Sequence, residues 1–482
     1  MDGQMDVFMR DSDAFSWYLE SDPTLRSTVV AVAWLDQSPD WDVLVAKVER
    51  ATRQIPMFRQ RVLEPPGRLA TPRWTWDDAF DLSWHLRRID APAPHTAATV
   101  IEFARHEAMT AFDRSRPLWE FTLIEEVEDG RATLVMKVHH SLTDGVGGIE
   151  LALLLFDAER SPTRSDAMPD APAGERIDML ELVRQSIARG FQRMTGLVVD
   201  SARSTVPWGV HAARHPVASA GEVLETVRSV GRTVAPIRVT LSPIMRERGL
   251  GRHLAVIEVG LNDLKRAAAT AGGTINDGFM AAVTGGMRRY HERHGSVPDE
   301  LRVTLPISIR TPEDPMGGNR ITLMRFAVPV SHPDPVHRMR EIDRLCRAVR
   351  AERSLAFANA IAGTLNLLPK WVVGSMFKHV DFVASDVPGF STPMYLAGAL
   401  LERYVAFGPT IGSSVNLTLL SYNGTCSVGI MVDTAAVPDH DTLVDCLREG
   451  FEEVLAVAGD HGAARLPLRG SVGAAGGRSA GA

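Results

Sequence analysis

The chain is poor in cysteine and carries no excess of positive charge. Its 482 residues contain only three cysteines, Cys346, Cys426 and Cys446. They are too few and too widely spaced for a disulfide framework or a zinc cluster, and they fit a reduced cytoplasm. Lys and Arg number 52 against 59 Asp and Glu, which gives a formal net charge of −7 and argues against a dedicated nucleic-acid binder.

Long hydrophobic runs are also missing. No stretch of about 18 apolar residues occurs, and the nearest one, 365–383, is interrupted by Lys370, Lys378 and Asp381. The first ten residues include acidic side chains and lack the apolar segment of a signal peptide. We therefore expect a protein that is soluble or bound to a membrane surface, without a transmembrane span.

What the chain does contain is enough apolar material for sizeable cores, since 45% of its residues are hydrophobic. In residues 1–160 and again in 251–465, helix and strand patterns alternate, which predicts two α/β units of similar size. In the first unit, we predict helices over 40–53, 96–109 and 149–159, and strands over 121–126 and 131–138. In the second unit, we predict helices over 276–294 and 441–457, and strands over 301–310, 415–420 and 425–432.

Two local signals refine the second unit. Asn423-Gly424 lies between the last two predicted strands and is the strongest short signal for a β-hairpin. Pro306 lacks a backbone N–H, so its strand is predicted to lie at a sheet edge or to carry a bulge.

Residues 161–250 are predicted to connect the two units. Between 181 and 238, eight arginines stand against four acidic residues, a difference of +4, and apolar residues recur among them at roughly helical spacing. This pattern is typical of solvated connector helices packed on the core, and also of a basic amphipathic surface that contacts anionic lipid. The last segment, 466–482, is rich in Gly and Ala and is predicted to be a flexible tail.

The densest cluster of reactive side chains is His139-His140-Ser141-Leu142-Thr143-Asp144-Gly145, between a predicted strand and a predicted helix. Reactive side chains are often presented at that place in α/β folds. A histidine with an ordinary pKa of about 6.5 can accept and return a proton near neutrality. Asp144 can fix the geometry of the loop, and Gly145 permits a tight turn and the close approach of a substrate.

The residues alone leave alternatives for this cluster open. The two histidines could be purely structural. They could ligate a metal with Asp144, but adjacent side chains on an extended backbone point to opposite faces. Gly145, Gly147 and Gly148 imitate part of a dinucleotide-binding loop, although Glu150 stands where that motif continues with glycine.

Other catalytic signatures are missing from the sequence or lie in the wrong context. No phosphate-binding loop of the type GxxxxGK[ST] occurs, and the single GxSxG match, 477–481, lies in the tail with no strand before it. His291 and His294 do not form an HExxH motif, and we expect them at the solvated end of a helix.

The histidine cluster resembles the HHxxxDG acyltransferase superfamily, which includes chloramphenicol acetyltransferases and peptide-synthetase condensation domains. Further segments narrow the resemblance to the bacterial wax ester synthase/diacylglycerol acyltransferase family, over about 13–455. They are PLWE at 117–120, ND at 276–277, LPISIR at 305–310, GNR at 318–320, SDVPG at 385–389, YLAG at 395–398 and SYNG at 421–424. One departure is Asp386, where we expect Asn before Val-Pro-Gly.

The resemblance implies an α/β fold of two chloramphenicol-acetyltransferase-like lobes with a pseudo-two-fold relation and a tunnel between them. It implies transfer of a long-chain acyl group from acyl-CoA, a co-substrate, to diacylglycerol, with long-chain alcohols as a second class of acceptor. It implies His140 as general base, no acyl-enzyme, no cofactor and no metal.

The resemblance also assigns supporting residues. His139, Asp144 and Gly145 shape the loop, and Asp144 is expected to pair with an arginine, for which Arg310 is our candidate, although Arg310 could also be a plain surface residue. Asn276 and Asp277 could line the site from the second lobe, or simply cap their helix.

Two other functions compete with this one. The chain could be an amide-forming condensation enzyme, or a non-catalytic lipid-droplet-binding protein with a relict site. The expected partners are acyl-CoA, a lipid alcohol and a membrane or lipid-droplet surface, with no nucleic acid. The expected location is the cytoplasm, peripherally at the inner face of the membrane or on lipid droplets.

Overall fold

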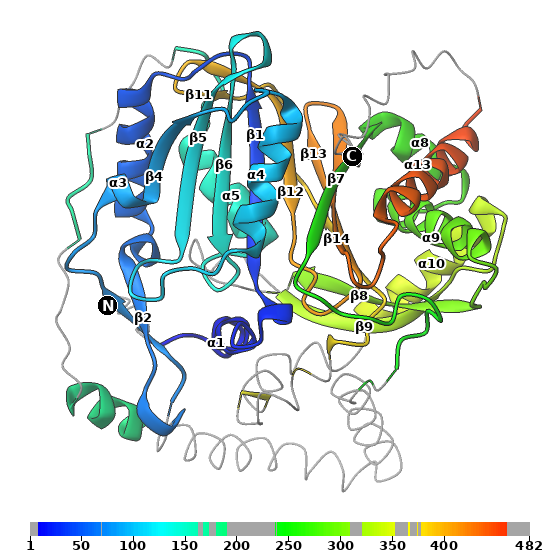
Figure 1. The fold of residues 1–482 in the computed structure, drawn as a ribbon, viewed down its shortest axis with the longest axis horizontal. Helices are drawn as coiled ribbons and strands as arrows, with labels where there is room; N and C mark the ends of the chain where they lie inside the picture. Colours follow the sequence, from blue (N-terminus) through cyan, green and yellow to red (C-terminus); the bar gives the residue numbers. More distant parts are fainter. Residues whose placement is uncertain are drawn as a thin grey trace, which may run out of the picture.

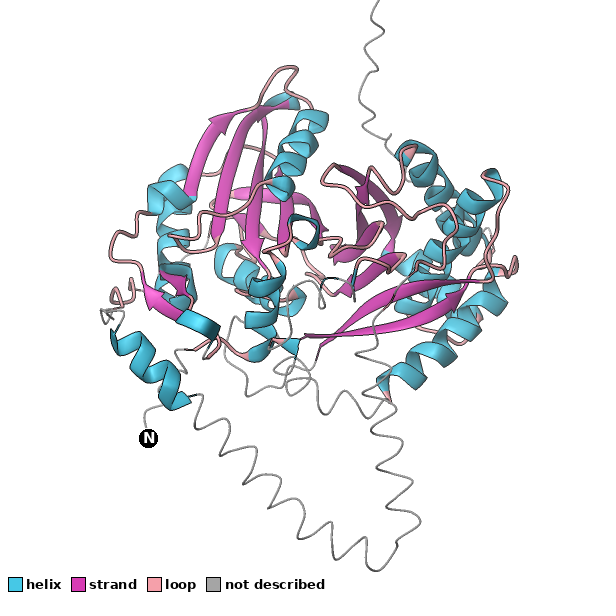
Figure 2. Ribbon diagram, turned by 60° about the horizontal axis from the view of Figure 1, so that its bottom comes forward, coloured by secondary structure: helices cyan, strands magenta, loops and turns pink. Residues whose placement is uncertain are grey.

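Two β-sheets lie next to each other in the computed structural model, and helices pack against both of them (Figure 1, Figure 2). The structure describes residues 8–68, 70–161, 167–172, 180–189, 237, 239–308, 321–351, 365–366, 374 and 377–459. Each sheet has six strands, and a separate two-stranded sheet is formed by β2 (Gln60–Leu63) and β3 (Arg73–Trp76). The two α/β lobes predicted from the sequence are therefore present.

The first sheet is mostly antiparallel. Its strand order is β11 (Tyr395–Leu396), β12 (Ala399–Phe407), β1 (Thr28–Leu35), β6 (Arg131–His139), β5 (Trp119–Val127) and β4 (Leu86–Asp90). Only β4 and β5 run parallel. The predicted strands over 121–126 and 131–138 are confirmed as β5 and β6.

Helices cover both faces of the first sheet. One face carries α2 (Trp41–Gln54) and α5 (Gly145–Leu155), and the other carries α4 (Ala97–Met109). The predictions for α2 and α4 are confirmed, and the carboxylate of Asp40 caps α2 by accepting a hydrogen bond from the N–H of Val43 at 3.0 Å. Two shorter helices, α1 (Asp11–Leu19) and α3 (Leu82–His85), complete this lobe.

The helix predicted over 149–159 is placed differently, because α5 begins at Gly145 and ends at Leu155. Its apolar run gave no signal for its start. The start is set by Asp144, whose carboxylate accepts a hydrogen bond from the N–H of Gly147 at 2.8 Å. The helix therefore begins directly after the histidine cluster.

The second sheet is covered on one face by four helices (Figure 1). Its strand order is β7 (Arg252–Gly260), β14 (Thr425–Asp433), β13 (Val415–Tyr422), β10 (Phe382–Val387), β8 (Glu300–Ser308) and β9 (Ile321–Pro329). The helices are α8 (Leu261–Thr270), α9 (Ile275–Arg293), α10 (Pro335–Arg350) and α13 (His440–Ala456). Of these, α9 and α13 confirm the predictions for 276–294 and 441–457.

Of the two local signals in the second lobe, the hairpin is confirmed, and the prediction of an edge or bulged strand at Pro306 is wrong. Asn423 and Gly424 adopt positive φ values of 43° and 82° and join β13 to β14 as a tight hairpin. The strand with Pro306 lies inside the sheet order, between β9 and β10. Its pairing with β10 covers only Val303 and Thr304, so Pro306 has a ladder neighbour on one side alone, in β9.

One segment of the second half of the chain belongs to the first sheet. β11 and β12 lie within the expected range of the second lobe, 251–465, yet β12 pairs antiparallel with β1 from Val30↔Phe407 to Leu35↔Leu401. The sheets also approach each other closely here, because a Cβ atom added to Gly429 in β14 would lie 2.1 Å from the carbonyl oxygen of Ala406 in β12. The two lobes are therefore joined by a shared strand as well as by the connector.

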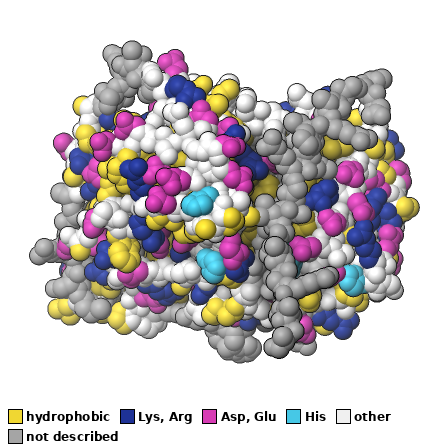
Figure 3. Space-filling model, turned by 45° about the horizontal axis from the view of Figure 1, so that its top comes forward, with side chains coloured by type: hydrophobic (Ala, Val, Ile, Leu, Met, Phe, Trp, Pro, Cys, Tyr) yellow, Lys and Arg dark blue, Asp and Glu magenta, His cyan; other side chains and the backbone are white. Residues whose placement is uncertain are grey.

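The surface charges and the burial of side chains agree with the expectations from the sequence, except at one histidine. On the face drawn in Figure 3, Lys and Arg side chains are interspersed with Asp and Glu side chains. Among the described residues, no helix combines the length and the apolar character that a membrane span requires. The exception is His291, which we expected at a solvated helix end; it is fully buried, because its ring nitrogens contact the carbonyl oxygen of Met287 and the hydroxyl of Ser242, each at 2.8 Å.

Most of the predicted connector lies outside the described residues. One described part, 180–189, is helical and buries Leu182 and Ser186, while Leu180 and Ile187 are exposed. Arg184 pairs with Glu181 at 2.8 Å. The predicted tail, 466–482, lies outside the described residues altogether.

Candidate active site

A cavity of about 270 Å³ lies between the two lobes and is lined mostly by apolar side chains. The first lobe contributes β6 and the start of α5, including His140 and Gly145. The second lobe contributes the end of β10, including Val387, and the shared strand β12 contributes Tyr404. The cavity therefore exists only where both lobes meet.

The histidine pair sits at the end of β6, and the backbone sends its two side chains in different directions. The N–H of His139 donates to the carbonyl oxygen of Leu118 at 3.0 Å, and the N–H of His140 donates to that of Ser27 at 2.8 Å. Successive side chains of an extended strand point to opposite sides. His139 is accordingly fully buried, whereas His140 is half-buried and lines the cavity.

His139 is held by polar partners on both ring nitrogens. Its Nδ1 lies 2.7 Å from the hydroxyl of Ser141, and its Nε2 pairs with the carboxylate of Glu20, which follows α1. Burial raises the pKa of Glu20, but the charge and hydrogen bond of His139 outweigh it and bring that pKa below its ordinary value. The ring edges of Trp17 and Phe112 pack on His139 as well, so this imidazole is a fixed part of the core.

His140 has the setting of a proton acceptor. Burial lowers its pKa below the ordinary value of histidine, and the nearby Asp144 carboxylate opposes this shift only in part. Its Nδ1 is buried and has no hydrogen-bond partner within the described part of the chain. The neutral imidazole, which can accept a proton, is therefore favoured at neutral pH.

Asp144 and Gly145 shape the loop in the way the sequence suggested. Asp144 is 3% exposed and caps α5. A Cβ atom on Gly145 would lie 2.9 Å from a methyl group of Val387 in the other lobe, so glycine lets the start of α5 approach β10. Arg310, the predicted partner of Asp144, lies outside the described residues.

The second-lobe wall of the cavity carries two ionisable groups. Asp386 lines the cavity near the end of β10, and burial raises its pKa to about 6, against a smaller opposing effect of Arg350. Arg325 on β9 also lines the cavity, and burial lowers its pKa to about 10, with Arg302 acting in the same direction. The departure noted in the SDVPG motif is thus a cavity residue.

Asn276 and Asp277 are not among the described residues that line the cavity. Asp277 forms a capping box, since its carboxylate accepts from the N–H of Thr274 at 2.7 Å and from its hydroxyl at 2.8 Å. The amide of Asn276 contacts the Sγ of Cys346 at 3.7 Å. The helix-cap interpretation therefore describes Asp277, and both side chains are buried at the start of α9.

Sequence reasoning did not identify Glu20 or Arg325. Glu20 lies 119 positions before His139 at the end of a helix, and no local pattern marks it as the partner of a distant histidine. Arg325 belongs to a strand that the sequence analysis did not predict. Both are brought to the site by tertiary packing, since the cavity and the end of β6 are formed by segments far apart in the chain.

Comparison with known proteins gives matches over most of the chain. The wax ester synthase/diacylglycerol acyltransferase catalytic domain matches residues 9–279, and the C-terminal domain of the same family matches residues 317–454. A Mycobacterium tuberculosis protein with the name "Putative diacyglycerol O-acyltransferase" is 35% identical over 93% of this chain and 91% of its own length. A second protein of that species and name is 29% identical over 93% of this chain and 90% of its own.

Solved structures share the two-lobed fold. A wax ester synthase/diacylglycerol acyltransferase from Marinobacter aquaeolei is 23% identical, with a TM-score of 0.61 over 94% of this chain and all of the other. The first condensation domain of the calcium-dependent antibiotic synthetase is 15% identical, with a TM-score of 0.62 over 94% of this chain and 96% of the other. At these low sequence identities, the two structures show a shared fold and nothing about activity.

Proposed function

Since the chain belongs to the wax ester synthase/diacylglycerol acyltransferase family, we propose that it transfers a long-chain acyl group from acyl-CoA to the hydroxyl of diacylglycerol. The observation that carries this proposal is a single histidine, His140, at the edge of an apolar cavity between two lobes. An apolar cavity suits lipid chains, and the histidine supplies the one proton-transfer group that ester formation needs.

The proposed step is a direct transfer between two bound substrates. Nδ1 of His140 is buried, so Nε2 is the nitrogen that a substrate reaches. Nε2 takes the proton of the acceptor hydroxyl while the oxygen attacks the thioester carbon and forms the new C–O bond. The C–S bond then breaks, and the CoA thiolate receives the proton from His140. No acyl-enzyme and no cofactor take part, because the protein holds two reactants together and moves one proton.

The surroundings of His140 suit this role. Its lowered pKa keeps the imidazole neutral, as a base must be before the reaction. Behind it, the buried pair of His139 and Glu20 fixes the end of β6, so the backbone that carries His140 is rigid. Asp144 acts on the loop as a helix cap, which supports a structural role instead of a place in a catalytic triad.

A long-chain alcohol is the second acceptor class, because it offers the same hydroxyl on an apolar chain and would give a wax ester. An amide-forming condensation activity would need an amine acceptor instead. The similarity to condensation domains concerns the fold alone and adds no support to that alternative.

Labelled palmitoyl-CoA tests the proposal. The purified protein is incubated with it and with dioleoylglycerol, hexadecanol or an aminoacyl thioester, and the products are separated by thin-layer chromatography. We expect labelled triacylglycerol, and the His140→Ala variant should lose ~10²–10⁴-fold in rate while it keeps its fold. His106→Ala is the matched control, since His106 is an exposed histidine of the same lobe and should leave the rate unchanged.

Three results would contradict the proposal. If His140→Ala esterifies at the wild-type rate, His140 is not the base. If only the amine acceptor is labelled, the protein is a condensation enzyme. If no acceptor is labelled although the protein binds lipid droplets, the site is a relict.

The acceptor lipid dissolves poorly in water, so we place the enzyme peripherally at the inner face of a membrane or on lipid droplets. The described part of the connector supports this placement, because Leu180 is 79% exposed and Ile187 is 53% exposed beside the exposed Arg184. Exposed apolar side chains next to basic ones are typical of segments that lie in a lipid interface. The connector is thus the proposed contact with anionic lipid.

A further inference from the structure

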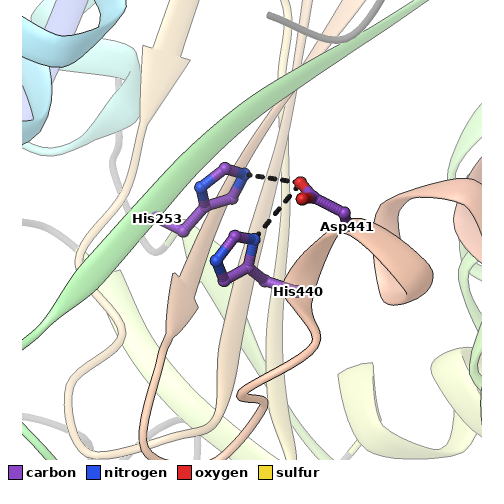
Figure 4. A group of neighbouring side chains, drawn as sticks. All are labelled: His253, His440 and Asp441. Atoms are coloured by element: carbon purple, nitrogen blue, oxygen red, sulfur yellow. Dashed lines mark hydrogen bonds and ion pairs between the residues drawn. The ribbon is translucent and has the colours of Figure 1, made fainter. Parts of the chain in front are cut away.

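Two histidines and an aspartate lie together outside the cavity, where β7 meets the first turn of α13 (Figure 4). His253 belongs to β7, and His440 and Asp441 begin α13. The two imidazole rings stack, with centroids 3.9 Å apart and planes 15° from parallel. Both rings direct a nitrogen toward the same carboxylate oxygen, as Figure 4 shows.

The separations within this cluster suit a shared ion. Oδ1 of Asp441 lies 3.3 Å from Nδ1 of His440 and 3.8 Å from Nε2 of His253. Two ligand atoms at the usual ~2.1 Å from a tetrahedral zinc ion are about 3.4 Å apart. All three ligand atoms lie within 4.8 Å of one another, and both imidazole rings must turn out of their stacked arrangement to bring their nitrogens onto one ion.

We propose that His253, His440 and Asp441 bind a divalent metal ion of the zinc class. Two imidazoles and a carboxylate suit Zn²⁺, Ni²⁺ or Cu²⁺ and disfavour Mg²⁺ and Ca²⁺, which take oxygen ligands. Three protein ligands leave a fourth position for water. The site goes beyond the proposed acyl transfer, since none of its three residues is among the described residues that line the cavity.

The cluster lies at the surface of the second lobe. His253 and His440 are half-buried, and Asp441 is exposed. An ion therefore reaches the three ligand atoms from solvent.

A bound ion would fasten the start of α13 to β7. Because α13 packs against α9 in the core of the second lobe, holding its first turn stabilises that lobe. The expected role of the ion is therefore structural. It is tested by measuring stability and metal binding, without an assay of acyl transfer.

Zinc titration tests this site. Chelator-treated full-length protein, with any purification tag removed, is titrated with ZnCl₂ by calorimetry at pH 7.5, and Co²⁺ serves as a spectroscopic probe. We expect one equivalent of Zn²⁺ per chain, a rise of several degrees in melting temperature, and visible absorption bands from bound Co²⁺. MgCl₂ should have no effect.

Single substitutions identify the ligands. Loss of a ligand should weaken Zn²⁺ binding by ~10-fold or more, since loss of a residue that only hydrogen-bonds to a ligand already costs that much. The Asp441→Asn and His440→Gln variants should therefore both bind Zn²⁺ poorly. Asp445→Asn is the matched control, because Asp445 is an exposed aspartate of the same helix and should bind as the wild type. Binding should also weaken at pH 5.5, where protons compete for the imidazoles.

The proposal is overturned by either of two results. One is a wild-type protein that binds no stoichiometric Zn²⁺ or Co²⁺. The other is an Asp441→Asn or His440→Gln variant whose affinity equals that of Asp445→Asn. In both cases, the cluster is only a stacked pair of histidines beside an exposed carboxylate, to which the nearer one, His440, is hydrogen-bonded.

Discussion

Replacing Asp386 by asparagine should stabilise the protein at neutral and alkaline pH. Burial raises the pKa of this carboxyl from its ordinary 3.8 to about 6. Between these two pH values the unfolded chain is ionised and the folded chain holds the proton, so stability falls as the pH rises. The free energy of unfolding has lost this whole contribution above about pH 6 to 7.

The size of the effect follows from the shift. Two pKa units correspond to about 3 kcal/mol of stability, at ~1.4 kcal/mol per unit. Asn keeps the shape of the protonated acid and never ionises. Asp386→Asn should therefore be about 3 kcal/mol more stable than the wild type at pH 8, which corresponds to ~3 °C in melting temperature when both lobes unfold together, at ~2.1 cal/mol/K of unfolding entropy per residue. At pH 4 the difference should nearly vanish.

Melting curves of both proteins between pH 4 and pH 8 measure this difference, by calorimetry or circular dichroism. Asp129→Asn is a suitable control, since that side chain is 85% exposed and should show no pH-dependent gain. The variant should keep its acyltransferase activity, because asparagine is the residue we expect before Val-Pro-Gly. A variant that is no more stable at pH 8, or whose advantage is the same at every pH, would refute the burial argument and place Asp386 in the ionised form.

Three further outcomes are expected. Glu20→Gln should lower the free energy of unfolding by ~3–5 kcal/mol at pH 7, because it leaves the buried His139 without its ion-pair partner. The difference in melting temperature from the wild type should shrink as the pH falls below 4.5, the ordinary pKa of this carboxyl. An unchanged melting temperature at pH 7 would contradict this prediction. Asp144→Ala and Arg310→Ala should each lower both melting temperature and activity, and a double-mutant cycle should show coupling between them, whereas strictly additive losses would exclude the pairing. Less protein should sediment with anionic liposomes as the salt concentration rises. Charge reversal in the connector should release the protein from the liposomes, while turnover of detergent-dispersed substrate persists. Equal binding to neutral liposomes would mean that the connector has only a structural role. The reversed residues are Arg184, Arg189 and Arg193.

Sequence reasoning succeeded where local patterns decide the structure. The spacing of apolar residues placed α2, α4, α9 and α13, because amphipathic helices bury one face wherever they pack. Asn423-Gly424 placed its hairpin, since few other residues adopt the positive φ values that the turn requires. The histidine cluster could be located for a related reason, because a strand that ends directly before a glycine-rich helix start is a local feature.

Sequence reasoning failed where contacts are made between distant segments. Glu20 and His139 meet only because α1 packs beside the end of β6, and nothing near Glu20 in sequence marks it. Nor did the sequence suggest that β12 would join the sheet of the other lobe, since Ala399–Phe407 shows no clean alternation. His291 was misjudged because its burial depends on Ser242, nearly 50 residues earlier. The cluster of His253, His440 and Asp441 went unnoticed for the same reason.

Because β12 belongs to the first sheet, the chain cannot be divided into two independent domains at the connector, where the sequence suggests a boundary. A fragment that ends in the connector would lack β12, and the backbone groups by which β1 pairs with β12, between Val30 and Leu35, would face solvent as an open edge. Such edges recruit other chains and cause aggregation. The complementary fragment would carry β11 and β12 with no sheet to join. The two lobes therefore form one folding unit and must be expressed together. Truncations or domain exchanges should keep 399–407 together with the first lobe.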